Sequence, residues 1–193
     1  MKRIAVLISG GGTNLQALID ARDSGALPCE IACVISSNAG AYGLERAARA
    51  GIPAYVVTRA HGAARRDAVM LRILRKNRVD LVVLAGYLGI LSSRFIAQYE
   101  NKIVNIHPAL LPKFGGVGMY GIHVHEAVIA SGDTVTGATA HYVTEAVDGG
   151  AVIKQMTMDV LPGDTPASLQ HRLLETVEHT LLVDVVRQLC IEN

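Results

Sequence analysis

Ile103-Val104-Asn105-Ile106-His107-Pro108-Ala109-Leu110-Leu111-Pro112 begins as a β-branched, apolar run and ends between two prolines. β-Branched residues favour a strand, whereas proline interrupts both strands and helices. On an extended backbone Asn105 and His107, two residues apart, point to the same side. Ligands of open α/β sheets bind at the carboxyl ends of the strands. The segment therefore predicts a buried strand that presents an amide and an imidazole to a ligand, although a core strand with two polar residues at its tip gives the same pattern.

The composition fits one α/β domain and does not favour nucleic-acid binding. The chain has 193 residues, half of them hydrophobic but only 4% aromatic, so Ala, Val, Leu and Ile must fill the core, as in buried parallel strands. We expect residues 1–193 to form a single domain. The net charge is +1, and a nucleic-acid binder would need a concentrated basic patch. The densest basic residues alternate with apolar ones and predict the exposed face of a helix: Arg65, Arg66, Arg72, Arg75, Lys76 and Arg78.

The sequence carries no sign of a membrane, a metal or an oxidising compartment. The longest apolar run, 81–91, contains two glycines and is too short to span a bilayer, and the first residues do not form a signal peptide. The cysteines Cys29, Cys33 and Cys190 form no C-x-x-C pair, and we expect them to be reduced and buried in a cytoplasmic protein. The segment 123–126 is His-Val-His-Glu rather than H-E-x-x-H, so no metal site is expected.

Strand-like and helix-like patterns alternate along the first half of the chain. Apolar runs predict strands at 4–9, 31–36, 53–57, 81–85 and 102–106. Helical patterns between them predict helices at about 14–24, 42–50, 63–76 and 92–99, the second of which ends at Gly51. This alternation indicates right-handed βαβ units and a parallel sheet.

The second half of the chain changes pattern. After a loop rich in Pro and Gly, a helix is expected near 123–130. Residues 134–144 and 151–160 alternate around a turn and predict an antiparallel hairpin. A last helix starts at Asp164-Thr165-Pro166, with Thr165 or Asp164 as its cap, and has a long apolar stripe. The fold class is therefore α/β, a mostly parallel twisted sheet with a C-terminal antiparallel hairpin and a final long helix.

A glycine-rich loop follows the first strand. The loop Gly10-Gly11-Gly12-Thr13-Asn14 has Leu15 in place of the third glycine of a dinucleotide fingerprint, and it lacks the G-K-[ST] of a Walker A loop. What remains is a strand, three glycines and a helix start, a generic anion site made of backbone N–H groups and the helix dipole. A tight turn with Thr13 as helix cap explains the same residues, and the two functions can coexist.

A single acidic residue stands in the hairpin turn. Asp148 precedes Gly149 and Gly150, and an aspartate in this position is usually a turn former. On its own it carries little functional weight.

Four segments together resemble one enzyme family. The chain contains Ser9-Gly10-Gly11-Gly12-Thr13-Asn14, Leu84-Ala85-Gly86-Tyr87, Asn105-Ile106-His107-Pro108-Ala109-Leu110-Leu111-Pro112 and Val147-Asp148-Gly149-Gly150 in that order. This combination is similar to the folate-dependent phosphoribosylglycinamide formyltransferases of purine biosynthesis. The resemblance covers nearly the whole chain and includes a loop variant at 115–126. It implies a single formyltransferase-type Rossmann-like domain.

The resemblance also implies a reaction and its site. The family transfers the formyl group of 10-formyltetrahydrofolate, a co-substrate, to the amine of glycinamide ribonucleotide without a metal. The matching positions imply catalysis by Asn105, His107 and Asp148, nucleotide binding by Gly12, Thr13, Asn14 and Glu178, and folate binding by Arg65, Leu88, Gly89, Ile90, Leu91 and Asn105. Residues of about 1–100 would form the nucleotide-binding half, and residues of about 101–193 the folate-binding and catalytic half. A monomer or homodimer without nucleic-acid or membrane partners is expected.

The three catalytic residue types suit this chemistry. When an amine attacks the formyl carbon, the carbonyl oxygen gains negative charge and the folate nitrogen must be protonated to leave. Asn105 can donate to that oxygen, and a cationic His107 can donate to it or supply the proton. A carboxylate such as Asp148 would stabilise the imidazolium and raise its pKa.

Some positions depart from the family pattern. Thr13 replaces a usual Ser but keeps the hydroxyl group, and Leu88-Gly89 replaces a common Met-Arg pair, so that one cation is lost. The folate-contacting arginine aligns best with Arg65, with Arg66 adjacent, and Glu175 occupies a position where some members have Lys or Gln.

Three other functions use similar residues. A methionyl-tRNA formyltransferase would need an additional tRNA-binding domain, and a formyltetrahydrofolate hydrolase would carry an extra N-terminal domain before the first strand. A non-catalytic nucleotide-binding Rossmann module would have no need for Asn105, His107 and Asp148 together.

Overall fold

The computed structural model describes residues 1–58, 60 and 62–191, so residues 59, 61, 192 and 193 of the expected domain lie outside the described residues. Seven strands form one sheet: β1 (Lys2–Ile8), β2 (Cys29–Ser36), β3 (Ala54–Val56), β4 (Leu81–Leu84), β5 (Ile103–His107), β6 (Val135–Tyr142) and β7 (Val152–Asp159). The helices are α1 (Thr13–Asp23), α2 (Gly43–Arg49), α3 (Ala63–Lys76), α4 (Ser93–Gln98), α5 (Ile122–Ser131), α6 (Pro166–Leu173) and α7 (His179–Ile191).

The sheet has the order β3-β2-β1-β4-β5-β6-β7. Strands β1 to β5 pair in parallel, β6 is antiparallel to β5, and β7 is antiparallel to β6. The expected α/β class, with its parallel sheet and antiparallel hairpin, is confirmed. The chain order reverses between β1 and β4, and this switch point opens a crevice at the carboxyl ends of the strands.

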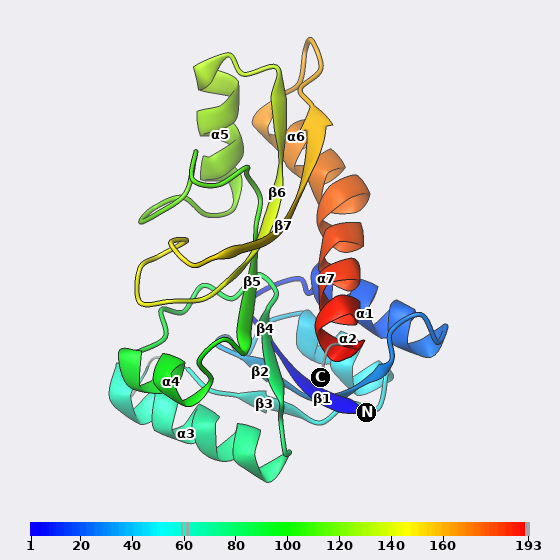
Figure 1. Cartoon of the computed structure of the whole chain (residues 1–193), viewed down its shortest axis with the longest axis vertical. Coiled ribbons are helices and arrows are strands. Elements are labelled where there is room, and N and C mark those ends of the chain that lie inside the picture. The colour runs from blue at the N-terminus through cyan, green and yellow to red at the C-terminus, as the bar shows by residue number, and fades with distance from the viewer. Residues whose placement is uncertain (59, 61, 192–193) are drawn as a thin grey trace.

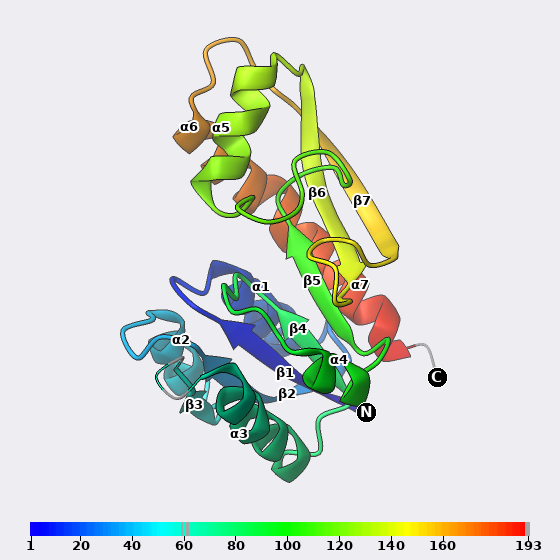
Figure 2. The ribbon, with the colours of Figure 1, turned by 90° about the vertical axis from the view of Figure 1, so that its left-hand side faces the viewer.

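Helices cover both faces of the parallel strands (Figure 1). Alternate residues of β1 face opposite sides, so that Ile4, Val6 and Ile8 join a core with α1 and α7. Ala5 and Leu7 join a second core with α3 and α4 on the other face. Figure 2 shows β6 and β7 extending beyond the parallel strands, with α5 and α6 beside their far end.

The expected final long helix is confirmed, but it contains a π turn. A π turn, Leu174–Glu178, separates α6 from α7. A π turn adds a residue to one turn of a helix, and such turns are frequent at functional sites. Glu178 at the end of this turn is buried. The 3.6-residue periodicity of the apolar stripe gave no sign of the extra residue.

Two other expectations, the N-cap of α1 and the exposure of Arg66, are wrong. Gly12, not Thr13, is the N-cap of α1, in the left-handed conformation, and no side chain caps this helix. Arg66 was expected on the exposed face of α3 but is buried together with Asp67. Cys29 and Cys33 are buried as expected, whereas Cys190 is only half-buried; all three are free thiols.

The start of α6 is fixed by a capping box in which Thr165, one of the two caps predicted from the sequence, is the N-cap. The Thr165 side chain accepts from the Ser168 N–H at 3.2 Å, and the Ser168 hydroxyl accepts from the Thr165 N–H at 2.9 Å. Pro166 is the first helical residue.

Replacing Thr165 with alanine is expected to lower the free energy of unfolding by about 1 kcal/mol, the usual effect of losing such a cap. Urea unfolding of both proteins measures it. Thr180→Ala, an exposed position on α7, is the matched control and should change stability by less than about 0.5 kcal/mol. Equal stabilities of Thr165→Ala and Thr180→Ala would contradict the role of the cap.

Candidate active site

The carboxyl ends of β1, β4 and β5 open into one cavity of about 910 Å³. This size is typical of a pocket for a drug-sized ligand. Its wall combines the glycine loop, the segment after β4, the loop after β5 and the hairpin turn around Asp148. All the site residues predicted from the sequence line this cavity except Arg65, which is exposed and is not among the lining residues.

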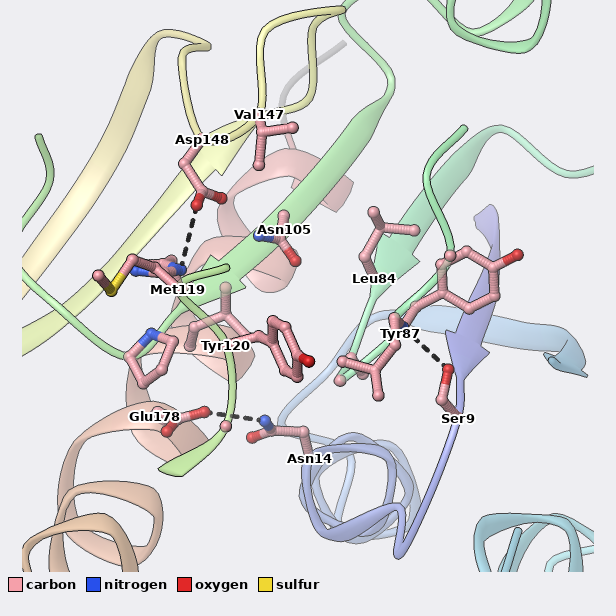
Figure 3. Close-up of a pocket in the computed structure, with 18 of the residues that line it drawn as sticks. Ser9, Asn14, Leu84, Tyr87, Asn105, Met119, Tyr120, Val147, Asp148 and Glu178 are labelled. Carbon is pink, nitrogen blue, oxygen red and sulfur yellow. Dashed lines mark hydrogen bonds and ion pairs between the residues drawn. The ribbon is translucent and has the colours of Figure 1, made fainter. Parts of the chain in front are cut away.

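Asn105 and His107 both line the cavity from the end of β5, as predicted from their spacing; Figure 3 shows Asn105 at this position. The Pro-rich segment after them is held by Thr139 of β6, whose hydroxyl donates to the Ala109 carbonyl at 2.6 Å and accepts from the Leu111 N–H at 3.0 Å. The backbone that follows His107 therefore has defined partners although it is neither strand nor helix.

Asp148 stands between two histidines. Its Oδ2 lies 3.5 Å from His107 Nδ1, and its Oδ1 lies 3.6 Å from His141 Nε2. Its Oδ2 also accepts from the Gly116 N–H at 2.9 Å. The residue has a left-handed backbone, φ 54°, which aspartate tolerates better than most residues. The turn-former interpretation is correct for the backbone, and the carboxylate nevertheless points at the two imidazoles.

His141 is a site residue that the sequence analysis missed. It lies opposite Asn105 in the β5–β6 pairing, and Asn105 Nδ2 lies 3.1 Å from His141 Nε2. Because His141 Nδ1 lies 2.9 Å from the Tyr142 carbonyl, which can only accept, Nδ1 carries a proton. In the neutral ring Nε2 then accepts from Asn105. His141 lies on a strand with the expected alternation, but the hairpin register that places it here is not visible in the sequence.

Burial decides the net pKa shift of His107. It lowers the pKa and outweighs both the Asp148 carboxylate and the Phe114 carbonyl, which favour the cation. The contribution of Asp148 has the direction expected from the sequence. His107 Nε2 donates to the Phe114 carbonyl at 2.8 Å.

The ionised form of Asp148 is favoured. Burial by itself raises the pKa of Asp148, but the nearby His141 ring, the hydrogen bond from the Gly116 N–H and the charge of a protonated His107 together hold it below its ordinary value. Asp148 is therefore an anion at neutral pH, and it stabilises a proton on either imidazole.

A third buried histidine lies in the same wall. His125 on α5 is fully buried, and burial, with His107 nearby, lowers its pKa to about 4. In the described part of the chain neither ring nitrogen has a hydrogen-bond partner. In the sequence, the His-Val-His-Glu pattern at 123–126 suggests this residue only as a candidate metal ligand. Among the described residues no group of three His, Cys, Asp or Glu side chains could hold a metal ion.

The glycine loop forms the other end of the cavity. Gly12 has φ 71°, a backbone conformation that residues with a side chain rarely adopt. An added Cβ would also lie 2.7 Å from the Gly43 Cα, so both backbone strain and a steric clash exclude a side chain here. Arg46 of α2 steadies the loop by donating from Nε to the Gly11 carbonyl at 2.9 Å. No Lys or Arg is among the described lining residues, so an anion here would be held by backbone N–H groups and the α1 dipole.

Asn14 and Glu178 meet beside this loop. Asn14 Nδ2 donates to Glu178 Oε2 at 3.1 Å, as Figure 3 shows. Burial raises the pKa of Glu178 to about 7, against the effect of the Asn14 hydrogen bond. A half-protonated carboxyl group at neutral pH can both donate to and accept from a polar ligand.

The segment after β4 presents apolar side chains to the cavity. Leu88 and Ile90 are 54% and 70% exposed, and Leu91 closes the wall behind them. At Gly89 an added Cβ would lie 2.5–2.6 Å from two ring carbons and the hydroxyl oxygen of Tyr87. This chain has Gly89 where the family commonly has an arginine. The Tyr87 side chain packs against the backbone at Gly89 and leaves no room there for a side chain.

Comparison with known proteins agrees with this geometry. Residues 2–186 match the family model described as formyl transferase. The phosphoribosylglycinamide formyltransferase of Haemophilus influenzae is 46% identical over 91% of this chain and 81% of its own length. The trifunctional purine biosynthetic protein adenosine-3 of Drosophila pseudoobscura is 47% identical over 89% of this chain, which spans only 12% of that protein.

A solved structure shares the fold closely. Glycinamide ribonucleotide transformylase 1 from Symbiobacterium toebii superimposes with a TM-score of 0.91 at 42% identity, covering 97% of this chain and 86% of that one. Within the described residues no helix is long and apolar enough to cross a membrane.

Proposed function

Since this chain belongs to the formyl transferase family, we propose that it transfers the formyl group of 10-formyltetrahydrofolate to the amine of glycinamide ribonucleotide in purine biosynthesis. The observation that carries the proposal is the position of Asp148 between His107 and His141, with Asn105 beside them at the end of β5. The relatives' names favour this reaction over formyltetrahydrofolate hydrolysis or a non-catalytic nucleotide-binding module.

The two substrates occupy opposite ends of the cavity. The nucleotide phosphate lies on Gly12, Thr13 and Asn14, and Glu178 contacts the ribose part of the nucleotide. The folate ring lies along the segment 88–91 and reaches Asn105. Arg65 lies outside the cavity, so it can meet only a part of the folate that extends beyond the opening.

The catalytic residues act on the formyl group. Asn105 Nδ2 has two hydrogens, of which one binds His141 and the other can donate to the oxygen that gains charge. Cationic His107 keeps Nδ1 towards Asp148. Its Nε2–H can donate to the same oxygen in place of the Phe114 carbonyl, or supply the proton that the folate nitrogen needs.

The proposal extends to the location, assembly and partners of the enzyme. It works in the cytoplasm as a monomer or homodimer, needs no metal, and has small molecules rather than nucleic acids as partners. Residues of about 1–100 supply the phosphate-binding loop and residues of about 101–193 the catalytic residues, while the segment 88–91 and Glu178 contribute across this division to folate and nucleotide binding.

The test follows absorbance as purified protein converts 10-formyl-5,8-dideazafolate in the presence and absence of glycinamide ribonucleotide. We expect turnover only when the amine is present, with one formylated product per folate consumed. Release of formate without the amine would show the hydrolase instead. Binding of both ligands without turnover would show a non-catalytic module.

A further inference from the structure

The folate-facing segment has no regular structure to hold it. Residues 88–92 connect the end of β4 to the start of α4, and Leu88, Gly89, Ile90 and Leu91 all line the cavity. A segment that presents exposed apolar side chains to a ligand needs other contacts to fix its backbone.

Three side chains bind this backbone at every second residue. The Leu88 N–H donates to the Ser9 hydroxyl at 2.9 Å, the bond drawn beside Tyr87 in Figure 3. Arg66 Nη2 donates to the Ile90 carbonyl, and the Ser92 N–H donates to Asp67 Oδ2 at 2.8 Å. Two of the three anchors are therefore consecutive residues of α3, and neither is among the residues that line the cavity.

Arg66 and Asp67 also bind each other. Arg66 Nε and Nη2 lie 2.8 and 2.7 Å from Asp67 Oδ1, and each side chain is only 4% exposed. Two charges removed from water are tolerated when they are paired and their remaining groups are bonded. Here the remaining groups bond to the segment, so the pair and the segment fix each other.

We propose that Arg66 and Asp67 are a positioning pair that holds the segment 88–92 in the shape that binds the folate, without touching either substrate. The inference deepens the proposed function, on which its kinetic part rests. It assigns to Arg66 a different role from the folate contact considered for this pair of arginines, because the Arg66 guanidinium is turned to the Ile90 carbonyl and Asp67.

The pair also links the segment to α4. Ser92 is the N-cap of α4, and its hydroxyl accepts from the Phe95 N–H at 3.3 Å. Because Asp67 accepts from the Ser92 N–H, it holds the residue at which the segment ends and the helix begins. Loss of Asp67 should therefore loosen the segment at this end while leaving the glycine loop unchanged.

The experiment compares Asp67→Ala, Arg66→Met and the double variant with the wild type. Removing one member leaves the other charge buried, so each single variant should bind the folate analogue at least about tenfold more weakly than the wild type. The KM for glycinamide ribonucleotide should change less than about twofold. Arg72→Ala, an exposed arginine of the same helix, is the control and should change neither KM.

Amide exchange gives a second measurement that needs no turnover. In Asp67→Ala the Ser92 amide should exchange at least about tenfold faster than in the wild type, whereas the amides of β1 should not change. This exchange measurement tests whether Asp67 anchors the segment 88–92, even if the enzyme acts on other substrates. Equal exchange at Ser92, an unchanged KM for the folate, or an equal rise in both KM values would each overturn the positioning role.

Discussion

Replacing His107 with alanine is expected to lower the turnover number by about 10²–10⁴-fold, the usual contribution of a general acid or base. His107 is the only one of the three proposed catalytic residues that can carry a proton to the folate nitrogen at neutral pH, since Asp148 is held in its ionised form. The absorbance assay with 10-formyl-5,8-dideazafolate measures the loss. His123→Ala, an exposed histidine of α5, is the matched control and should retain wild-type turnover.

The pH dependence separates the role of Asp148 from that of His107. If the cation of His107 is the active form, activity falls as the pH rises through its pKa. Asp148 raises that pKa against the larger effect of burial, so Asp148→Asn should shift the fall in activity to lower pH. Full turnover of His107→Ala would remove the proposed proton donor, and an unchanged profile in Asp148→Asn would remove the electrostatic role.

Replacing Glu178 with glutamine is expected to stabilise the protein by about 3 kcal/mol at pH 8. The pKa of Glu178 is about 7 in the folded protein and about 4.5 in an ordinary environment. Between these two values the unfolded chain has lost a proton that the folded chain retains, so the wild type loses stability as the pH rises. A difference of about 2.5 pKa units corresponds to about 3 kcal/mol.

Urea unfolding at pH 4.5 and pH 8 measures this effect. The two proteins should be nearly equally stable at pH 4.5 and differ at pH 8, while Glu178→Gln weakens nucleotide binding. Glu175→Gln, an exposed glutamate one turn earlier, is the control and should follow the wild type at both pH values. A constant difference between Glu178→Gln and wild type across this range would contradict the raised pKa.

The strands and most helices could be predicted from local patterns. The helix at 63–76 is found at its expected bounds, because its periodicity is clear and a glycine precedes it. Asn105, His107 and Asp148 could be named because the order of the motifs is specific. Their convergence on one cavity follows from the parallel sheet and the hairpin.

The missed features depend on contacts between distant segments. His141 faces Asn105 only through the β5–β6 register, and Arg66 is buried only because Asp67 and the segment 88–92 surround it. The direction of the His107 pKa shift depends on the depth of burial, which the sequence does not contain. A charged residue on an amphipathic helix is usually exposed, so the helical pattern alone predicts an exposed Arg66, whereas the residue is buried.

The cavity lies at the carboxyl ends of the parallel strands, whereas a different contact is made at their amino ends. Lys2 at the start of β1 donates from Nζ to the Leu189 carbonyl near the end of α7, at 2.6 Å, and both lie at the amino ends of the parallel strands, away from the cavity (Figure 2). The contact that joins the first strand to the last helix therefore takes no part in the cavity wall. A reporter group attached at this face would leave the cavity open to both proposed substrates.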